Sequence, residues 1–210
     1  MDSKKVSNNM LSRMPVYLNY IKTLPQNTQN ISATKIANAL GLGEVSVRKD
    51  LAKVSNGGRC KLGYSCEELI KDIETFLGIK STLDAVVVGK GEMIQILLNY
   101  GGFEDFGLNL VAGFDIDSWE KRNSSESFIY SMDQLESFFK ENHVCIGIIM
   151  VSAEDAQAVC DRLVGLGVDG IWNFTTTHLN VPEHVVLQNE SIAASITKLR
   201  MQLKERSEAS

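Results

Sequence analysis

The stretch that decides the fold is Ala85-Val86-Val87-Val88-Gly89-Lys90-Gly91-Glu92-Met93-Ile94. It begins with a continuously apolar run, which is typical of a strand buried on both faces of a parallel sheet. Gly89 and Gly91 then predict a tight turn that leads into a helix, and a second strand ends at Asp115, 21 residues beyond Ile94. A strand, a glycine-rich turn, a helix and an acidic residue after the next strand form the fingerprint of a Rossmann fold.

The same stretch forms a candidate cofactor site. In this fold the turn and the helix N-terminus hold a pyrophosphate, and the acidic residue binds ribose hydroxyls. An NAD(H) cofactor would therefore contact Gly89, Lys90, Gly91, Glu92, Met93, Ile94 and Asp115. Two residues depart from the fingerprint. Ile94 replaces its third glycine, so we expect the branched side chain to crowd the helix against the strand. Glu92 places a carboxylate near the phosphates, which Lys90 offsets. The residues alone leave NAD(H) binding open.

The chain beyond residue 65 alternates strands with helices. We predict strands over 84–89, 108–115, 144–151, 170–174 and 185–187, and helices over 67–77, 132–142 and 191–205, with two further helices that end at Tyr100 and Leu166. Ser152 and Asp155 predict a capping box at the start of the helix that ends at Leu166. Alternation of this kind predicts an α/β class with a parallel sheet covered by helices on both faces.

The net charge of the chain is unevenly distributed. The 210 residues include 21 basic and 26 acidic ones, a net charge of −5. Residues 1–64 hold ten basic and three acidic residues, a net of +7, whereas residues 65–210 carry −12. A basic segment of this size indicates a polyanionic partner, because Lys and Arg release counterions when they contact phosphates. A solvated basic surface without a partner is the alternative that charge alone leaves open.

The basic segment contains a helix-turn-helix pattern. Apolar spacing predicts a first helix over 11–24, which Pro15 should confine to the residues after it or place in the first turn. Ser32 predicts the N-cap of a helix through Leu40 that Gly41 ends, and a third helix follows over 44–54. Ala37, Gly41 and Val47 have helix-turn-helix spacing. The third helix would then present Ser46, Arg48 and Lys49 to the major groove of DNA.

A hairpin follows the third helix. Residues 55–58 (Ser-Asn-Gly-Gly) form a turn signal, and residues 59–64 are expected to form the second strand. Arg59 and Lys61 are two residues apart, so both would project from one face of that strand, as in the wing of a winged helix that enters the minor groove. A solvated hairpin explains the same residues.

The composition argues against other classes of protein. No run approaches the roughly 20 apolar residues that cross a bilayer, and the polar start of the chain lacks a secretory signal. The four cysteines form no CxxC pair, which predicts reduced thiols in the cytoplasm and no metal site. Hydride transfer needs an acid, a base or a polarising group beside the nicotinamide, and the sequence offers no evident one.

The order of these segments resembles the Rex family of redox-sensing transcriptional repressors, over nearly the whole chain. The most specific pieces are Val47-Arg48-Lys49-Asp50-Leu51, Leu62-Gly63-Tyr64, Leu98-Asn99-Tyr100-Gly101-Gly102-Phe103, Phe114-Asp115-Ile116-Asp117, Trp172-Asn173-Phe174 and Leu179-Asn180-Val181-Pro182. The resemblance implies a homodimer that binds an inverted-repeat operator and releases it when NADH binds. It also implies that Arg48, Lys49 and Arg59 contact the operator, and that a C-terminal helix is exchanged between subunits through Ile192, Ile196, Leu199 and Leu203.

The residues that differ from the family pattern belong to the part of the chain that the resemblance connects with the cofactor. The resemblance implies an aspartate and a phenylalanine where this chain has Ser191 and Ile192. In the family, that aspartate alternates between partners that correspond to Arg13 and Tyr100, and both of these residues are present here. The hypothesis is therefore a DNA-binding repressor with weakened, altered or lost redox sensing.

We expect a winged helix over 1–80, a Rossmann-like domain over 81–190 and an exchanged helix over 191–210. The competing hypotheses are a Rossmann oxidoreductase with an accessory helical domain and a regulator that senses a different small ligand.

Overall fold

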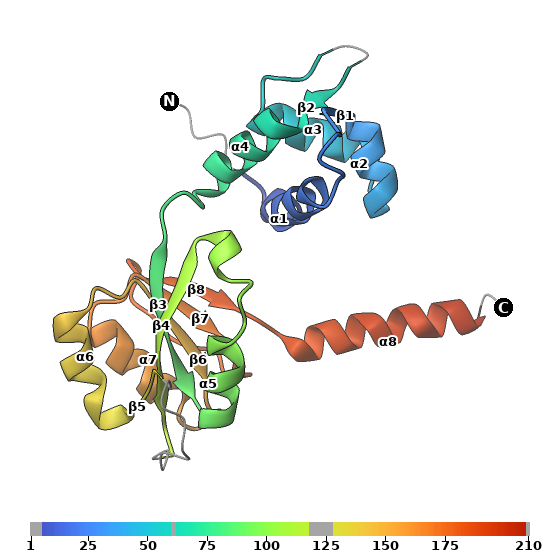
Figure 1. Ribbon diagram of the computed structural model, residues 1–210. Coiled ribbons are helices and arrows are strands. Elements are labelled where there is room, and N and C mark those ends of the chain that lie inside the picture. Colours follow the sequence, from blue (N-terminus) through green and yellow to red (C-terminus); the bar gives the residue numbers. More distant parts are fainter. Residues whose placement is uncertain (1–5, 60–61, 118–127, 209–210) are drawn as a thin grey trace. The chain divides into compact units, whose positions relative to one another are not determined.

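The computed structural model describes residues 6–59, 62–117 and 128–208, and Figure 1 shows their elements. The chain divides into two compact units, Met1–Ser81 and Thr82–Ser210. The first unit is mostly helical, and the second is built around a parallel sheet. The predicted α/β class and the order of the two parts are therefore confirmed.

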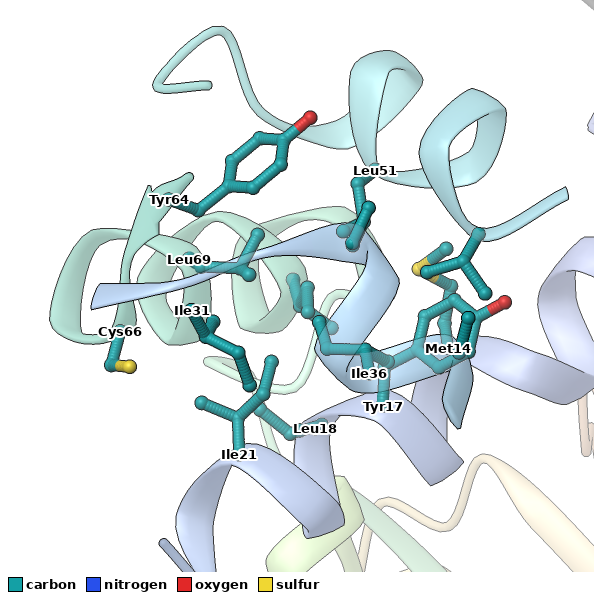
Figure 2. Packing of buried hydrophobic residues seen from close by; sticks show 14 of the residues in the cluster. Met14, Tyr17, Leu18, Ile21, Ile31, Ile36, Leu51, Tyr64, Cys66 and Leu69 are labelled. Carbon is teal, nitrogen blue, oxygen red and sulfur yellow. The ribbon is translucent and has the colours of Figure 1, made fainter. Parts of the chain in front are cut away.

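In its described residues, 6–59 and 62–81, the first unit packs four helices and a two-stranded sheet around one core. Its elements are α1 (Asn8–Lys22), β1 (Asn30–Ile31), α2 (Ala33–Leu40), α3 (Glu44–Val54), β2 (Tyr64–Ser65) and α4 (Cys66–Leu77). Figure 2 shows how Leu18 of α1, Ile36 of α2 and Leu69 of α4 meet in this core. The predicted caps of α2 are confirmed: Ser32 accepts a hydrogen bond from the Lys35 amide at 3.1 Å, and Gly41 has a φ of 64°.

Two local predictions in this unit are wrong. Pro15 lies well inside α1, because the helix begins earlier at Asn8, where the Ser7 hydroxyl accepts a hydrogen bond from the Met10 amide at 3.3 Å. Burial of Met10 and Met14 offsets the hydrogen bond that proline removes. In the described part of the expected strand over 59–64, Arg59 and Gly63 form an isolated bridge and Tyr64 belongs to β2, which pairs antiparallel with β1; residues 60 and 61 lie outside the described residues.

The described residues of the second unit form a six-stranded sheet in the order β5-β4-β3-β6-β7-β8, with every neighbouring pair parallel. Numbered within the unit, the order is 3-2-1-4-5-6, that of a dinucleotide-binding Rossmann sheet. The strands are β3 (Leu83–Gly89), β4 (Leu108–Asp115), β5 (Ile129–Ser131), β6 (Ile146–Met150), β7 (Gly170–Asn173) and β8 (Val186–Asn189).

Helices cover both faces of this sheet. The helix α5 (Gly91–Leu98) packs on one face, and α6 (Leu135–Glu141) and α7 (Ala156–Gly165) pack on the other (Figure 1). Two short 3-10 helices, Glu104–Phe106 and Met132–Gln134, complete the connections, and α8 (Ile192–Glu208) follows β8. The predicted capping box of α7 is wrong. The Ser152 hydroxyl bonds to the Asp155 carboxylate at 2.5 Å, and Asp155 itself occupies the N-cap position.

Candidate functional site

The helix α3 separates its buried residues from its polar ones. Val47 and Leu51 are fully buried in the core of the first unit. Ser46, Arg48 and Lys49, which the sequence predicts as DNA contacts, are all exposed. Arg48 forms an ion pair with Glu44 one turn earlier on the same helix. A helix held by its apolar face, with basic residues exposed on its outer face, can enter a major groove.

A tight loop after α3 provides the second predicted contact. Arg59 is exposed, and its amide donates to the Gly63 carbonyl at 2.8 Å while the Gly63 amide donates to the Arg59 carbonyl at 2.9 Å. Gly63 has a φ of 80°, and a Cβ there would lie 2.3 Å from the Ile31 carbonyl oxygen. Only glycine therefore lets this loop approach β1 so closely. Lys61, the other predicted wing residue, lies outside the described residues.

Arg13 binds within its own unit. Its guanidinium donates to the carboxylate of Asp50 on α3, at 2.8 Å from Nε and 2.7 Å from Nη2. This hydrogen bond to Asp50 is the main cause that raises the pKa of Arg13. The sequence pattern does not predict that Asp50 binds Arg13, although the spacing of Asp50 from Val47, Leu51 and Val54 places an acidic residue on the inward face of α3.

In the second unit, the carboxyl ends of three neighbouring strands mark the candidate cofactor site. Gly89 of β3 pairs with Asp115 of β4 on one side and with Met150 of β6 on the other. The strand order reverses between β3 and its neighbour β6, and open α/β sheets bind ligands at such a switch point. The structure therefore brings Gly89 and Asp115 together at the place that the sequence predicts.

The helix α5 begins directly above this edge. Lys90 is its N-cap residue, and the first hydrogen bond of the helix runs from the Ile94 amide to the Lys90 carbonyl at 3.0 Å. The amides of Gly91, Glu92 and Met93 belong to the first turn, where helical N–H groups have no partner within the helix and attract anions. Glu92 and Met93 are exposed, so the Glu92 side chain lies toward solvent.

The charged side chains around this helix start are mostly acidic. Asp115 is only 2% exposed and accepts a hydrogen bond from the Asp117 amide at 2.9 Å. Lys90 forms an ion pair with Asp117 at 3.0 Å, and this hydrogen bond is the main cause that raises the pKa of Lys90. The only basic group predicted at the site is therefore already paired with a carboxylate.

The expected crowding by Ile94 is wrong. Ile94 is fully buried, and its Cγ2 atom would lie 2.0 Å from a Cβ on Gly113 of β4. Gly113 thus leaves open the space that Ile94 fills. The missing glycine on the helix is matched by a glycine on the strand, a pairing between residues 19 positions apart that the sequence pattern did not reveal.

The backbone of this site fits a dinucleotide. A Cβ on Gly89 would lie 3.0 Å from the Met150 carbonyl oxygen, so glycine keeps the turn close to the sheet. The free amides at the start of α5 suit a pyrophosphate, and the buried Asp115 carboxylate suits ribose hydroxyls. The exposed Glu92 carboxylate competes with a phosphate for the field of the helix N-terminus, which lowers the affinity without blocking the turn.

The C-terminal helix α8 has an unburied apolar stripe. Ile192, Ile196, Leu199 and Leu203 are exposed by 68%, 60%, 58% and 59% of their surface. Ser191 caps the helix, since its hydroxyl accepts a hydrogen bond from the Ala194 amide at 3.0 Å. Tyr100, which corresponds to one of the two alternating partners in the family, is 59% exposed and contacts Phe103 edge to face, with ring centroids 5.0 Å apart.

The described residues, 6–59, 62–117 and 128–208, hold neither a membrane-spanning helix nor a cluster of metal ligands. No helix there is long and apolar enough to span a membrane. The same residues contain no group of three or more His, Cys, Asp and Glu side chains that could hold a metal ion.

The described residues form a basic helix and wing in one unit and a Rossmann switch point in the other. Together these define a ligand-responsive DNA-binding regulator.

Comparison with known proteins agrees with that class. Residues 5–52 match the family described as "Putative DNA-binding protein N-terminus", and residues 80–177 match the family described as "CoA binding domain". The redox-sensing transcriptional repressor Rex of Bacteroides thetaiotaomicron is 35% identical over 93% of this chain and 90% of its own. The Rex of Carboxydothermus hydrogenoformans is 35% identical over 95% of this chain and 97% of its own. The chain belongs to the Rex family of redox-sensing transcriptional repressors.

Solved structures of a Rex-family repressor agree with this family membership. The crystal structure of RSP, a Rex-family repressor, superposes with a TM-score of 0.83 at 29% identity and covers 98% of this chain and 97% of its own. The structure of RSP in complex with NAD⁺ and operator DNA gives a TM-score of 0.85 at 30% identity, over 98% of this chain and 95% of its own. RSP has also been solved in complex with NADH.

Proposed function

We propose that the chain is a sequence-specific repressor that binds an inverted-repeat operator as a homodimer. Residues 1–80 form the DNA-binding domain, residues 81–190 the NAD(H) domain and residues 191–210 the exchanged helix. The observation that carries the proposal is the outer face of α3, where Ser46, Arg48 and Lys49 are exposed above a buried apolar face. The RSP complex with operator DNA supports the same reading by analogy.

Within this proposal, Arg48 reads base edges and Lys49 contacts flanking phosphates. Arginine is suited to bidentate hydrogen bonds with guanine, whereas lysine acts as a point charge. Arg59 and Lys61 insert from the wing into the minor groove, where the negative potential attracts basic side chains. Action on operator DNA places the protein in the cytoplasm.

NAD(H) is the proposed ligand of the second unit. Gly89, Gly91 and Ile94 shape the turn, Lys90, Glu92 and Met93 surround the phosphates, and Asp115 binds ribose. The cofactor acts here as a signal and not as a hydride donor, so we propose that the chain is not an enzyme. The repressor names of its relatives support this part of the proposal.

The redox response is proposed to be weaker than in other family members. Ser191 replaces the family's aspartate and caps α8, and Arg13, which corresponds to one partner of that aspartate, is already bound by Asp50 inside the first unit. Exposed carboxylates at the helix start lower the attraction for phosphates.

Titration of purified protein with NADH, followed by intrinsic fluorescence or calorimetry, tests the cofactor proposal. We expect saturable one-to-one binding with at most a modest loss of DNA affinity. No binding at millimolar NADH would refute the cofactor, and complete release of DNA would refute the weakened response. Turnover of a nicotinamide substrate would restore the oxidoreductase hypothesis.

A further inference from the structure

The helix α3 carries one acidic side chain on its inner face. Asp50 is 6% exposed, and its neighbour Leu51 is fully buried. The other residues beside it, Arg48 and Lys49, are exposed. A carboxylate buried beside the proposed DNA-reading residues is costly unless it is fully bonded, so its partners are informative.

Three donors from α1 converge on one oxygen of Asp50. Arg13 donates from Nε at 2.8 Å and from Nη2 at 2.7 Å, and the Tyr17 hydroxyl donates at 3.0 Å. Arg13 Nε also lies 3.2 Å from the Tyr17 hydroxyl oxygen, so the three side chains form a closed network. Burial is the main cause that raises the pKa of Tyr17, and the bond to Asp50 adds to it, so the phenol stays protonated as a donor.

Directional bonds restrain α3 in a way that apolar contacts do not. Val47 and Leu51 anchor the helix through non-directional burial, which tolerates small rotations and slides. Charge-assisted hydrogen bonds to a single carboxylate oxygen are short and depend on angle. Buried ion pairs add little net stability, and their best-attested use is to fix one arrangement among several.

We propose that Asp50, with Arg13 and Tyr17, is a positioning residue that sets the rotation and register of α3 for base readout. The proposal rests on the proposed function of α3 in operator binding. Arg48 lies two residues before Asp50 on the other side of the helix, so a rotation of α3 displaces its guanidinium. Bidentate contact with a base edge is lost by small displacements, whereas contacts with phosphates tolerate them. The network therefore governs specificity more than overall affinity for DNA.

The test compares two duplexes and three variants of the full-length protein. The probes are the duplex that the wild-type protein enriches from a random-sequence library and a shuffled duplex of the same composition. Asp50→Asn keeps the shape of the side chain and removes its charge, and Tyr17→Phe removes only the hydroxyl. Lys22→Met is the matched control, because it breaks the 2.9 Å ion pair of α1 with Glu74 on α4 and leaves α3 untouched.

We expect Asp50→Asn to lower the affinity ratio between the two duplexes by about tenfold, a loss comparable to that of one base contact. Affinity for the shuffled duplex should change by less than about threefold, because it depends on the number of phosphate contacts. Tyr17→Phe should lower the ratio by a smaller factor, and Lys22→Met should leave it unchanged.

Circular dichroism and thermal unfolding report whether each variant is folded. An equal loss of affinity for both duplexes in folded Asp50→Asn would overturn the positioning role and leave the proposed function intact. If Asp50→Asn does not fold, an unchanged ratio in Tyr17→Phe overturns the positioning role. Failure of the wild type to enrich any sequence would refute the proposed function, and the positioning role with it.

Discussion

The contact between Ile94 and Gly113 predicts a large effect from one methyl group. In Gly113→Ala the new Cβ would lie 2.0 Å from Ile94 Cγ2, 3.4 Å from Ile94 Cβ and 3.6 Å from Val87 Cγ1. All of these atoms belong to fully buried side chains, so none can move into solvent. Overpacking of a filled core costs typically about 1–3 kcal/mol. We expect the free energy of unfolding to fall by at least the upper part of this range, because the clash is severe.

Urea unfolding at fixed protein concentration, followed by fluorescence of the tryptophans, measures this change. Ile94→Ala alone leaves a cavity and should cost about 2–5 kcal/mol. In the double variant, which combines Gly113→Ala with Ile94→Ala, the new methyl group at position 113 fills part of that cavity. The loss of unfolding free energy in the double variant should therefore be smaller than the sum of the two single losses by about 1–3 kcal/mol. Wild-type stability in Gly113→Ala, or strict additivity in the double variant, would refute the close pairing of these residues.

Three further variants test the DNA, dimer and cofactor assignments. Arg48→Ala should reduce affinity for the enriched duplex by about 1–3 kcal/mol and affinity for the shuffled duplex by much less, as measured by fluorescence anisotropy. Equal losses would mean that Arg48 contacts only phosphate. Deletion of 191–210 should abolish the dimer in analytical ultracentrifugation, since it removes the exposed apolar stripe of α8, and a well-behaved truncated dimer would contradict the exchanged helix. Asp117→Asn frees the Lys90 ammonium and removes a negative charge, so calorimetry should show tighter NADH binding at low salt and no gain at high salt; weaker binding at low salt would contradict the electrostatic argument.

The local sequence pattern was sufficient where a residue acts on its immediate neighbours. Ser32 and Gly41 bound α2 as predicted, because a capping hydroxyl and a left-handed glycine act within one turn. The strand β4 also has the predicted bounds Leu108–Asp115, and its second half, residues 112–115, is buried.

The local sequence pattern did not predict features of the structure that depend on a partner far away in the sequence. The strands β1 and β5 have only two and three residues and exist because β2 and β4 lie beside them. Pro15 lies deeper inside α1 than its local preference predicts, because burial of Met10 and Met14 outweighs that preference. At the sites, the acidic residue at the end of β4 and the exposed face of α3 follow from spacing alone. The pairing of Ile94 with Gly113 and that of Asp50 with Arg13 connect separate elements and leave no periodic signal.

The central claim is that this chain reads a specific DNA sequence and uses its second unit to sense NAD(H). Fluorescence anisotropy of the labelled enriched duplex, competed with the shuffled duplex in the presence and absence of NADH, tests it most directly. We predict a preference of about 10³-fold or more for the enriched duplex, the usual margin of specific binding, which saturating NADH reduces only modestly. Equal affinity for the two duplexes would contradict the claim.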